Sequence, residues 1–94
     1  MAKIFKYQLD LDKAEQQGEY ALIDVEMPEA AKILSVGVQH GTICVWAEVD
    51  VMADTETREF SVVGTGLEAP EDDKFLGTVQ LHDGHFVLHV YEKI

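Results

Sequence analysis

Three of the four histidines lie close together near the carboxyl end of the chain. His82, His85 and His89 are separated by two and three residues, and Asp83 lies between the first two. Imidazole and carboxylate groups are ligands for transition metals. In an extended strand, however, His89 lies roughly 13 Å from His85, which is too far for one ion. We therefore expect no metal or other cofactor, and His82 and His85 are interpreted as exposed groups whose protonation can make an interface sensitive to pH.

No other grouping of residues supports catalysis. Asp10, Asp12 and Glu15 occur at the spacing that opens a calcium-binding loop. Ala14 and Glu15, however, stand where that loop needs an oxygen ligand and a glycine. Cys44 lies inside an apolar run and is expected to be a packed, unreactive thiol. The sequence therefore predicts a protein that is not an enzyme.

The strongest chemical feature is negative charge. The chain has 18 Asp and Glu against 7 Lys and Arg, a net charge of −11, and most of it falls in residues 10–29 and 48–73. Such a surface repels nucleic-acid phosphates and anionic lipid, so we expect neither as a direct partner. It suits a protein with a basic surface, although it can also serve solubility alone. The acids of the two blocks can gather at one end of a small sheet structure. The residues predicted for interaction are Trp46, Asp50, Asp54, Glu68, Glu71, Asp72, Asp73, His82 and His85.

The elements that position these residues are predicted to be strands. Alternation of apolar and polar residues recurs along the chain, and Asp83-Gly84 and His40-Gly41 are typical of two-residue hairpin turns. Ninety-four residues can bury one modest core. The prediction is one all-β domain over residues 1–94, either a small antiparallel β-sandwich or a partly open barrel of about seven strands. Residues 10–19 are expected to form a loop or a short helical turn, and residues 50–57 and 66–74 polar loops.

Counting outward from each turn predicts the strand register. Around Asp83-Gly84, His82 pairs with His85, and the core side receives Phe75, Val79, Leu81, Phe86, Leu88 and Val90. Around His40-Gly41, the core side receives Leu34, Val36 and Val38 opposite Ala47, Val45 and Ile43. Trp46 then lies on the opposite face over Ser35, and a second copy of the chain can cover it there in a homodimer.

Several strand and turn segments occur together in a known order. They are Ile4 to Tyr7, Ala31 to Gln39, Gly41-Thr42, Cys44 to Ala47, Phe60 to Gly66, Phe75 to Leu81 and Phe86 to Glu92. In this the chain resembles a family of short uncharacterised proteins encoded by tailed bacteriophages and prophages. The segment from Leu11 to Glu19 is longer and more charged than expected from that family. The resemblance implies a setting in the bacterial cytoplasm during infection or lysogeny, and it implies no catalytic residue.

The predicted function is that of a small acidic phage-type accessory protein. It would be a non-enzymatic module that binds a host or phage protein, and it would inhibit host defence or nucleic-acid handling. One alternative is a binder or sponge for a small ligand such as a nucleotide or metal. Another is a minor virion assembly protein that uses exposed edge strands. A single cysteine and a first segment without a long apolar run favour the cytoplasm, with no membrane partner.

Overall fold

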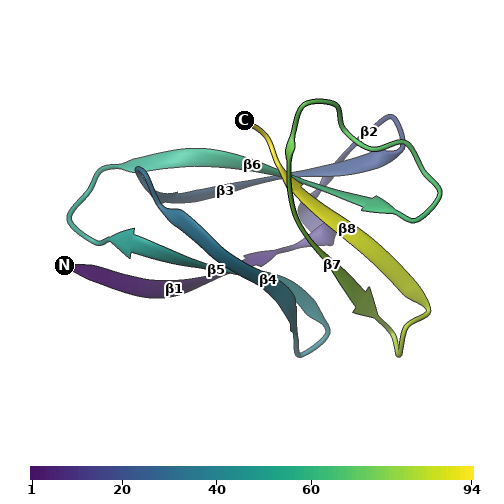
Figure 1. Ribbon diagram of the computed structural model, residues 1–94, viewed down its shortest axis with the longest axis horizontal. Coiled ribbons are helices and arrows are strands. Elements are labelled where there is room, and N and C mark those ends of the chain that lie inside the picture. The colour runs from purple at the N-terminus through teal and green to yellow at the C-terminus, as the bar shows by residue number, and fades with distance from the viewer.

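The computed structural model describes all 94 residues as two antiparallel sheets packed face to face (Figure 1). The smaller sheet has the strand order β1-β5-β4, and the larger has the order β2-β3-β6-β8-β7. The strands of the smaller sheet are β1 (Ala2–Leu9), β4 (Lys32–Gln39) and β5 (Thr42–Asp50). Those of the larger sheet are β2 (Glu15–Gln17), β3 (Tyr20–Pro28), β6 (Thr55–Gly64), β7 (Lys74–Leu81) and β8 (Phe86–Glu92). The all-β prediction is confirmed in its sandwich form, and there is no closed barrel.

The eighth strand lies in the segment that was predicted to be a loop or a short helical turn. Residues 10–19 contain a 3-10 turn, η1 (Leu11–Lys13), and the short strand β2. The carboxylate of Asp10 caps the turn by accepting a hydrogen bond from the backbone N–H of Asp12 at 2.9 Å. Residues 55–57 also belong to a strand rather than to the predicted loop. This turn is the only helical element, and no helix is long and apolar enough to cross a membrane.

The register predicted for the β7–β8 hairpin is confirmed from Gly77–Val90 to Leu81–Phe86. Two details differ. A bulge between Phe75 and Gly77 places Phe75 opposite Tyr91, on the outer face, and not on the core side as predicted. His82 has φ of 53°, so the ladder ends at Leu81–Phe86, and His82 meets His85 only through a turn hydrogen bond. Phe86, also predicted to be buried, is 55% exposed because it lies at the tip of the hairpin, beyond the core.

The β4–β5 hairpin also has its predicted register near the turn. Val36 lies opposite Val45, and Val38 opposite Ile43. A bulge between Ile33 and Ser35 puts Ile33 opposite Ala47, where Leu34 was predicted. Leu34 is consequently 44% exposed, and its assignment to the core was wrong.

The core fills the space between the two sheets. Its largest fully buried side chains come from five strands: Leu9, Met27, Ile43, Val45, Val49, Phe60 and Val90. One charged group closes the core at the end where β3 turns into β4. Arg58 of β6 donates from Nε to the buried carboxylate of Glu92 and from Nη1 to the carbonyl of Ala31 at 2.8 Å. The hydrogen bond to Glu92 raises the pKa of the Arg58 guanidinium, against the opposing effect of burial.

Candidate functional site

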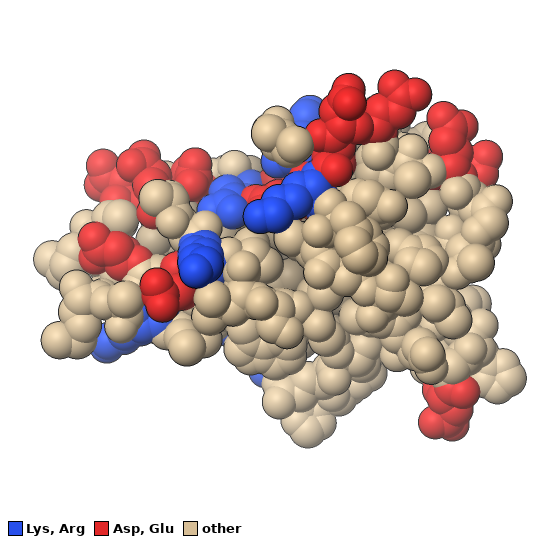
Figure 2. Space-filling view, in the orientation of Figure 1, with Lys and Arg blue, Asp and Glu red and all other residues tan.

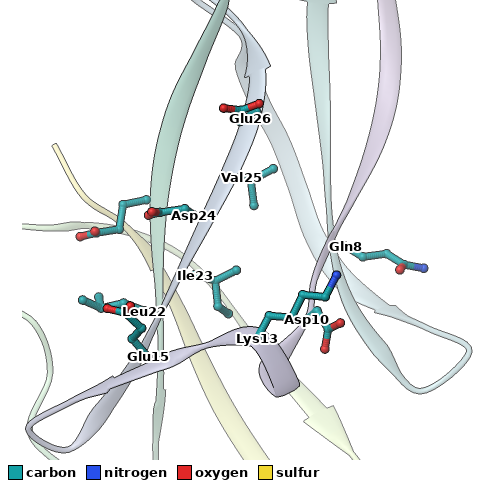
Figure 3. Close-up of a pocket in the computed structure, with 10 residues that line it drawn as sticks. Gln8, Asp10, Lys13, Glu15, Leu22, Ile23, Asp24, Val25 and Glu26 are labelled. Carbon is teal, nitrogen blue, oxygen red and sulfur yellow. The ribbon is translucent and has the colours of Figure 1, made fainter.

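The largest hollow in the molecule is a groove of about 460 Å³ between β1, η1 and β3 (Figure 3). Leu22, Ile23 and Val25 supply its apolar part. The polar residues that line it come from five elements or their connections: Gln8, Asp10, Lys13, Glu15, Asp24, Glu26 and Glu59. Five carboxylates face one ammonium group, so the groove has a formal charge of −4. It therefore combines a concave shape with a potential that attracts cations.

The groove exists because β2 is much shorter than β3. The three residues of β2 pair only with Tyr20, Ala21 and Leu22, whereas β6 pairs with all of β3. From Ile23 onward, the other edge of β3 has no neighbouring strand. β1 pairs only with β5, so its outward edge is also free. The groove is thus bordered by two strand edges whose alternate backbone N–H and C=O groups are unpaired.

Alternation along β3 places the charges at the rim of this groove. Ile23 is buried, and Val25 is half-buried on the same face. Asp24 and Glu26 alternate with them and are exposed (Figure 3). Neither Asp24 nor Glu26 makes an ion pair, whereas Glu59 lies 3.7 Å from Lys93. No set of three or more His, Cys, Asp or Glu side chains is arranged to hold a metal ion. The rim carboxylates are therefore available to an incoming cationic group.

The nine residues predicted for interaction do not form one site. Asp50 and Asp54 lie at the turn between β5 and β6, and Glu68, Glu71, Asp72 and Asp73 lie in the connection between β6 and β7. These two connections are at opposite ends of the long axis (Figure 1), and Figure 2 shows acidic groups at both ends. The idea that the acidic loops gather at one end was wrong, because β6 runs the length of the larger sheet between them.

Trp46 lies on the outer face of the smaller sheet and is half-buried. Its register partners are Lys6 on β1 and Ser35 on β4. A methyl group built on Gly37 would lie 3.4 Å from the indole, so the ring rests on that glycine. Trp46 does not line the groove.

His82 and His85 are exposed at the tip of the β7–β8 hairpin. The His82 ring makes an edge-to-face contact with Phe86 at 5.4 Å. His82 also borders a second hollow of about 290 Å³, together with Asp10 and Asp12. His89 lies apart from both, with its ring nitrogens 2.8 Å from the hydroxyl of Thr65 and 2.9 Å from that of Thr78. The three histidines are therefore not a cluster.

The sequence contained part of the signal for the groove. Alternation in residues 20–27 assigns Asp24 and Glu26 to the polar face of a strand. It does not show that β2 ends after three residues, or that β1 lies across from β3, because both depend on contacts between distant segments. For that reason Asp24, Glu26 and Glu59 were missed.

Comparison with known proteins places the chain in one family. The family model described as Domain of unknown function (DUF7352) matches residues 1–94. No curated protein and no solved structure gives a significant match. A function for this chain must therefore be inferred from its own geometry.

Proposed function

Because the chain belongs to the family Domain of unknown function (DUF7352), which brings no activity with it, we propose from its own geometry that it is a non-enzymatic protein-binding module. Its groove takes up an extended, basic segment of a partner protein. One observation carries the proposal: β2 covers only the first three residues of β3, and the edge left free lies in a groove with a formal charge of −4. The proposal includes inhibition of a host defence or nucleic-acid-handling protein in a bacterial cytoplasm. That setting rests on the resemblance to phage and prophage proteins.

An extended segment fits this place because it can continue the larger sheet. A strand laid beyond β2 along β3 would satisfy backbone groups of Ile23 to Glu26 that have no partner within the chain. Its alternate side chains would face the apolar surface of Ile23 and Val25 and the carboxylates of Asp24 and Glu26. Main-chain hydrogen bonds would supply affinity, and lysine or arginine side chains would supply charge complementarity.

A short synthetic peptide tests the groove directly. The probe is a fluorescently labelled peptide of about ten residues in which lysine alternates with threonine and valine, a length that spans a strand. We expect binding that weakens as salt is raised from about 50 to 300 mM, because screening reduces contacts between exposed charges. The double variant Asp24→Asn with Glu26→Gln should bind roughly tenfold more weakly at low salt, at about 0.7 kcal/mol for each lost charge.

Two controls separate groove binding from general attraction. The matched double variant Glu48→Gln with Asp83→Asn removes the same charge at two exposed positions that do not line the groove, and it should keep the affinity for the peptide. A peptide of the same sequence with N-methyl groups on alternate backbone nitrogens keeps the charge but cannot add as a strand, and it should bind weakly. Equal losses in both double variants, or unchanged binding of the methylated peptide, would contradict the proposal. Capture from bacterial lysate at the two salt concentrations would then identify the natural partner.

A further inference from the structure

One side of the molecule carries almost no charged residues. Residues 33–47 contain no Asp, Glu, Lys or Arg, and residues 75–91 contain only Asp83. Twenty-four of the 25 charged residues therefore lie in the other 62 positions. The uncharged residues form most of β4, β5, β7 and β8. Figure 2 shows the result as a broad surface without charge over β4, β7 and β8, which we name the uncharged face.

The uncharged face joins the two sheets. β4 is an edge strand of the smaller sheet and β7 an edge strand of the larger one, and they lie side by side without hydrogen bonds between them (Figure 1). The strands β4, β7 and β8 carry four large apolar side chains that are between 38% and 55% exposed, namely Leu34, Val38, Phe75 and Phe86. Exposed apolar side chains in such a continuous uncharged region are a mark of an interaction surface.

Two β-bulges expose apolar side chains on β4 and β7. Without the bulge in β4, alternation would place Leu34 on the core side, and without the bulge in β7 it would place Phe75 there. Bulges re-aim side chains, and they also interrupt the regular edge that another strand would need for pairing. The contact expected here is thus made by side chains and not by an added strand, which distinguishes it from the groove.

The exposed surface of one chain has room for an interface of the size that a stable dimer needs. One chain exposes 6063 Å², about 600 Å² more than the roughly 5,400 Å² expected for a monomeric protein of this mass. The elongated shape, 40 Å by 27 Å by 21 Å, contributes to this excess. A stable two-fold interface covers about 800 Å² on each partner, a small part of the surface that one chain exposes.

The net charge of the chain indicates which molecule binds to the uncharged face. Each copy has a net charge of −11, so two copies that approach through most of their surface bring like charges together. In a two-fold dimer the same patch meets itself, and it must be self-complementary. The uncharged face meets this condition, whereas a basic partner would be drawn to the acidic groove instead. We propose that the uncharged face binds a second copy of this chain in a two-fold dimer.

Sedimentation measurements test the dimer. At about 100 µM we expect a mass twice the 10.5 kDa of one chain, with dissociation that decreases as salt is raised, because salt screens the repulsion between the two acidic copies. The double variant Leu34→Lys with Phe75→Lys should sediment as a monomer at every concentration. Both side chains are exposed, and an unchanged far-UV circular dichroism spectrum with cooperative thermal unfolding will show that the fold is retained.

Two matched variants locate the interface. Met52→Lys makes a similar change at a residue that is 84% exposed in the turn between β5 and β6, and it should keep the dimer. Trp46→Ala, on the outer face beside Lys6, should also keep it, in contrast to the dimer predicted from sequence through that side chain. A wild-type protein that stays monomeric at both low and high salt would overturn the proposal. Loss of the dimer in Met52→Lys or Trp46→Ala, with the double variant unaffected, would also overturn it.

Discussion

Val36 of β4 packs directly over Gly77 of β7, and this contact sets the distance between the two sheets at their shared edge. A methyl group built on Gly77 would lie 2.5 Å from Cγ1 of Val36. No carbon atoms approach so closely without strain, so any larger residue at position 77 must push β4 away from β7. Gly77 also pairs with Val90 immediately after the bulge in β7. A substitution at position 77 should therefore disturb the packing of both hairpins.

Gly77→Ala should lower the free energy of unfolding by about 1–3 kcal/mol, the usual cost of overpacking. Adding Val36→Ala should recover part of that loss, because the smaller side chain makes room for the new methyl group. Gly37→Ala is the matched control: its methyl group would lie 3.4 Å from Trp46, at ordinary contact distance, and stability should change little. Urea denaturation of the four proteins measures these effects. Equal stability of wild type and Gly77→Ala would disprove the close packing.

Ser61→Ala should stabilise the protein. Ser61 on β6 is fully buried, and its hydroxyl oxygen has no hydrogen-bond partner. Removing an unsatisfied buried hydroxyl recovers its desolvation cost, so we expect a gain of about 1 kcal/mol in the free energy of unfolding. Ser35→Ala, at an exposed position, should alter the free energy of unfolding by less than about 0.5 kcal/mol. Thermal and urea unfolding provide the measurement, and a loss of stability in Ser61→Ala would show that the hydroxyl is bonded after all.

Alkaline pH should destabilise the protein partly through Tyr7. Burial raises the pKa of the Tyr7 hydroxyl above its ordinary value of 10.0. The folded chain thus keeps this proton at pH values where the unfolded chain has lost it. The contribution of Tyr7 to the free energy of unfolding is fully present below pH 10. It is lost as pH rises through the higher pKa that Tyr7 has in the folded chain. Urea unfolding between pH 8 and pH 11 should show a steeper decline for wild type than for Tyr7→Phe. Parallel curves for the two proteins would contradict this.

Cys44 should react slowly with thiol reagents, because the side chains that cover it must first move away. The side chain has no exposed surface although it points away from the core, toward the outer face of the smaller sheet. Lys6 donates a hydrogen bond to Gln39 at 2.7 Å, from β1 to β4, across the part of β5 that contains Cys44. Gln39→Ala removes this bond, worth about 1 kcal/mol, and should raise the labelling rate about fivefold. Lys13→Ala, on η1, should leave the rate unchanged, and equal rates in all three proteins would exclude a covering role for Gln39.

Local chemistry in the sequence determined the class of fold and much of its register. Asp83-Gly84 supplies the left-handed residues of a tight turn, and the alternation on either side allows one register, so Val79, Leu81 and Val90 could be assigned to the core correctly. The same reasoning paired Val36 with Val45. The negative charge and the absence of a catalytic motif also follow from residue types alone.

Only the tertiary structure decided where each feature lies in space. The bulges that expose Leu34 and Phe75 arise where two edge strands must bend, which alternation within one strand does not specify. The length of β2, and with it the free edge beside Asp24 and Glu26, depends on pairing between segments that turn chemistry does not link. Turns and alternation act over a few residues, whereas the acidic groove and the uncharged face are made by strands distant in sequence. Both proposed binding surfaces are therefore products of sheet packing.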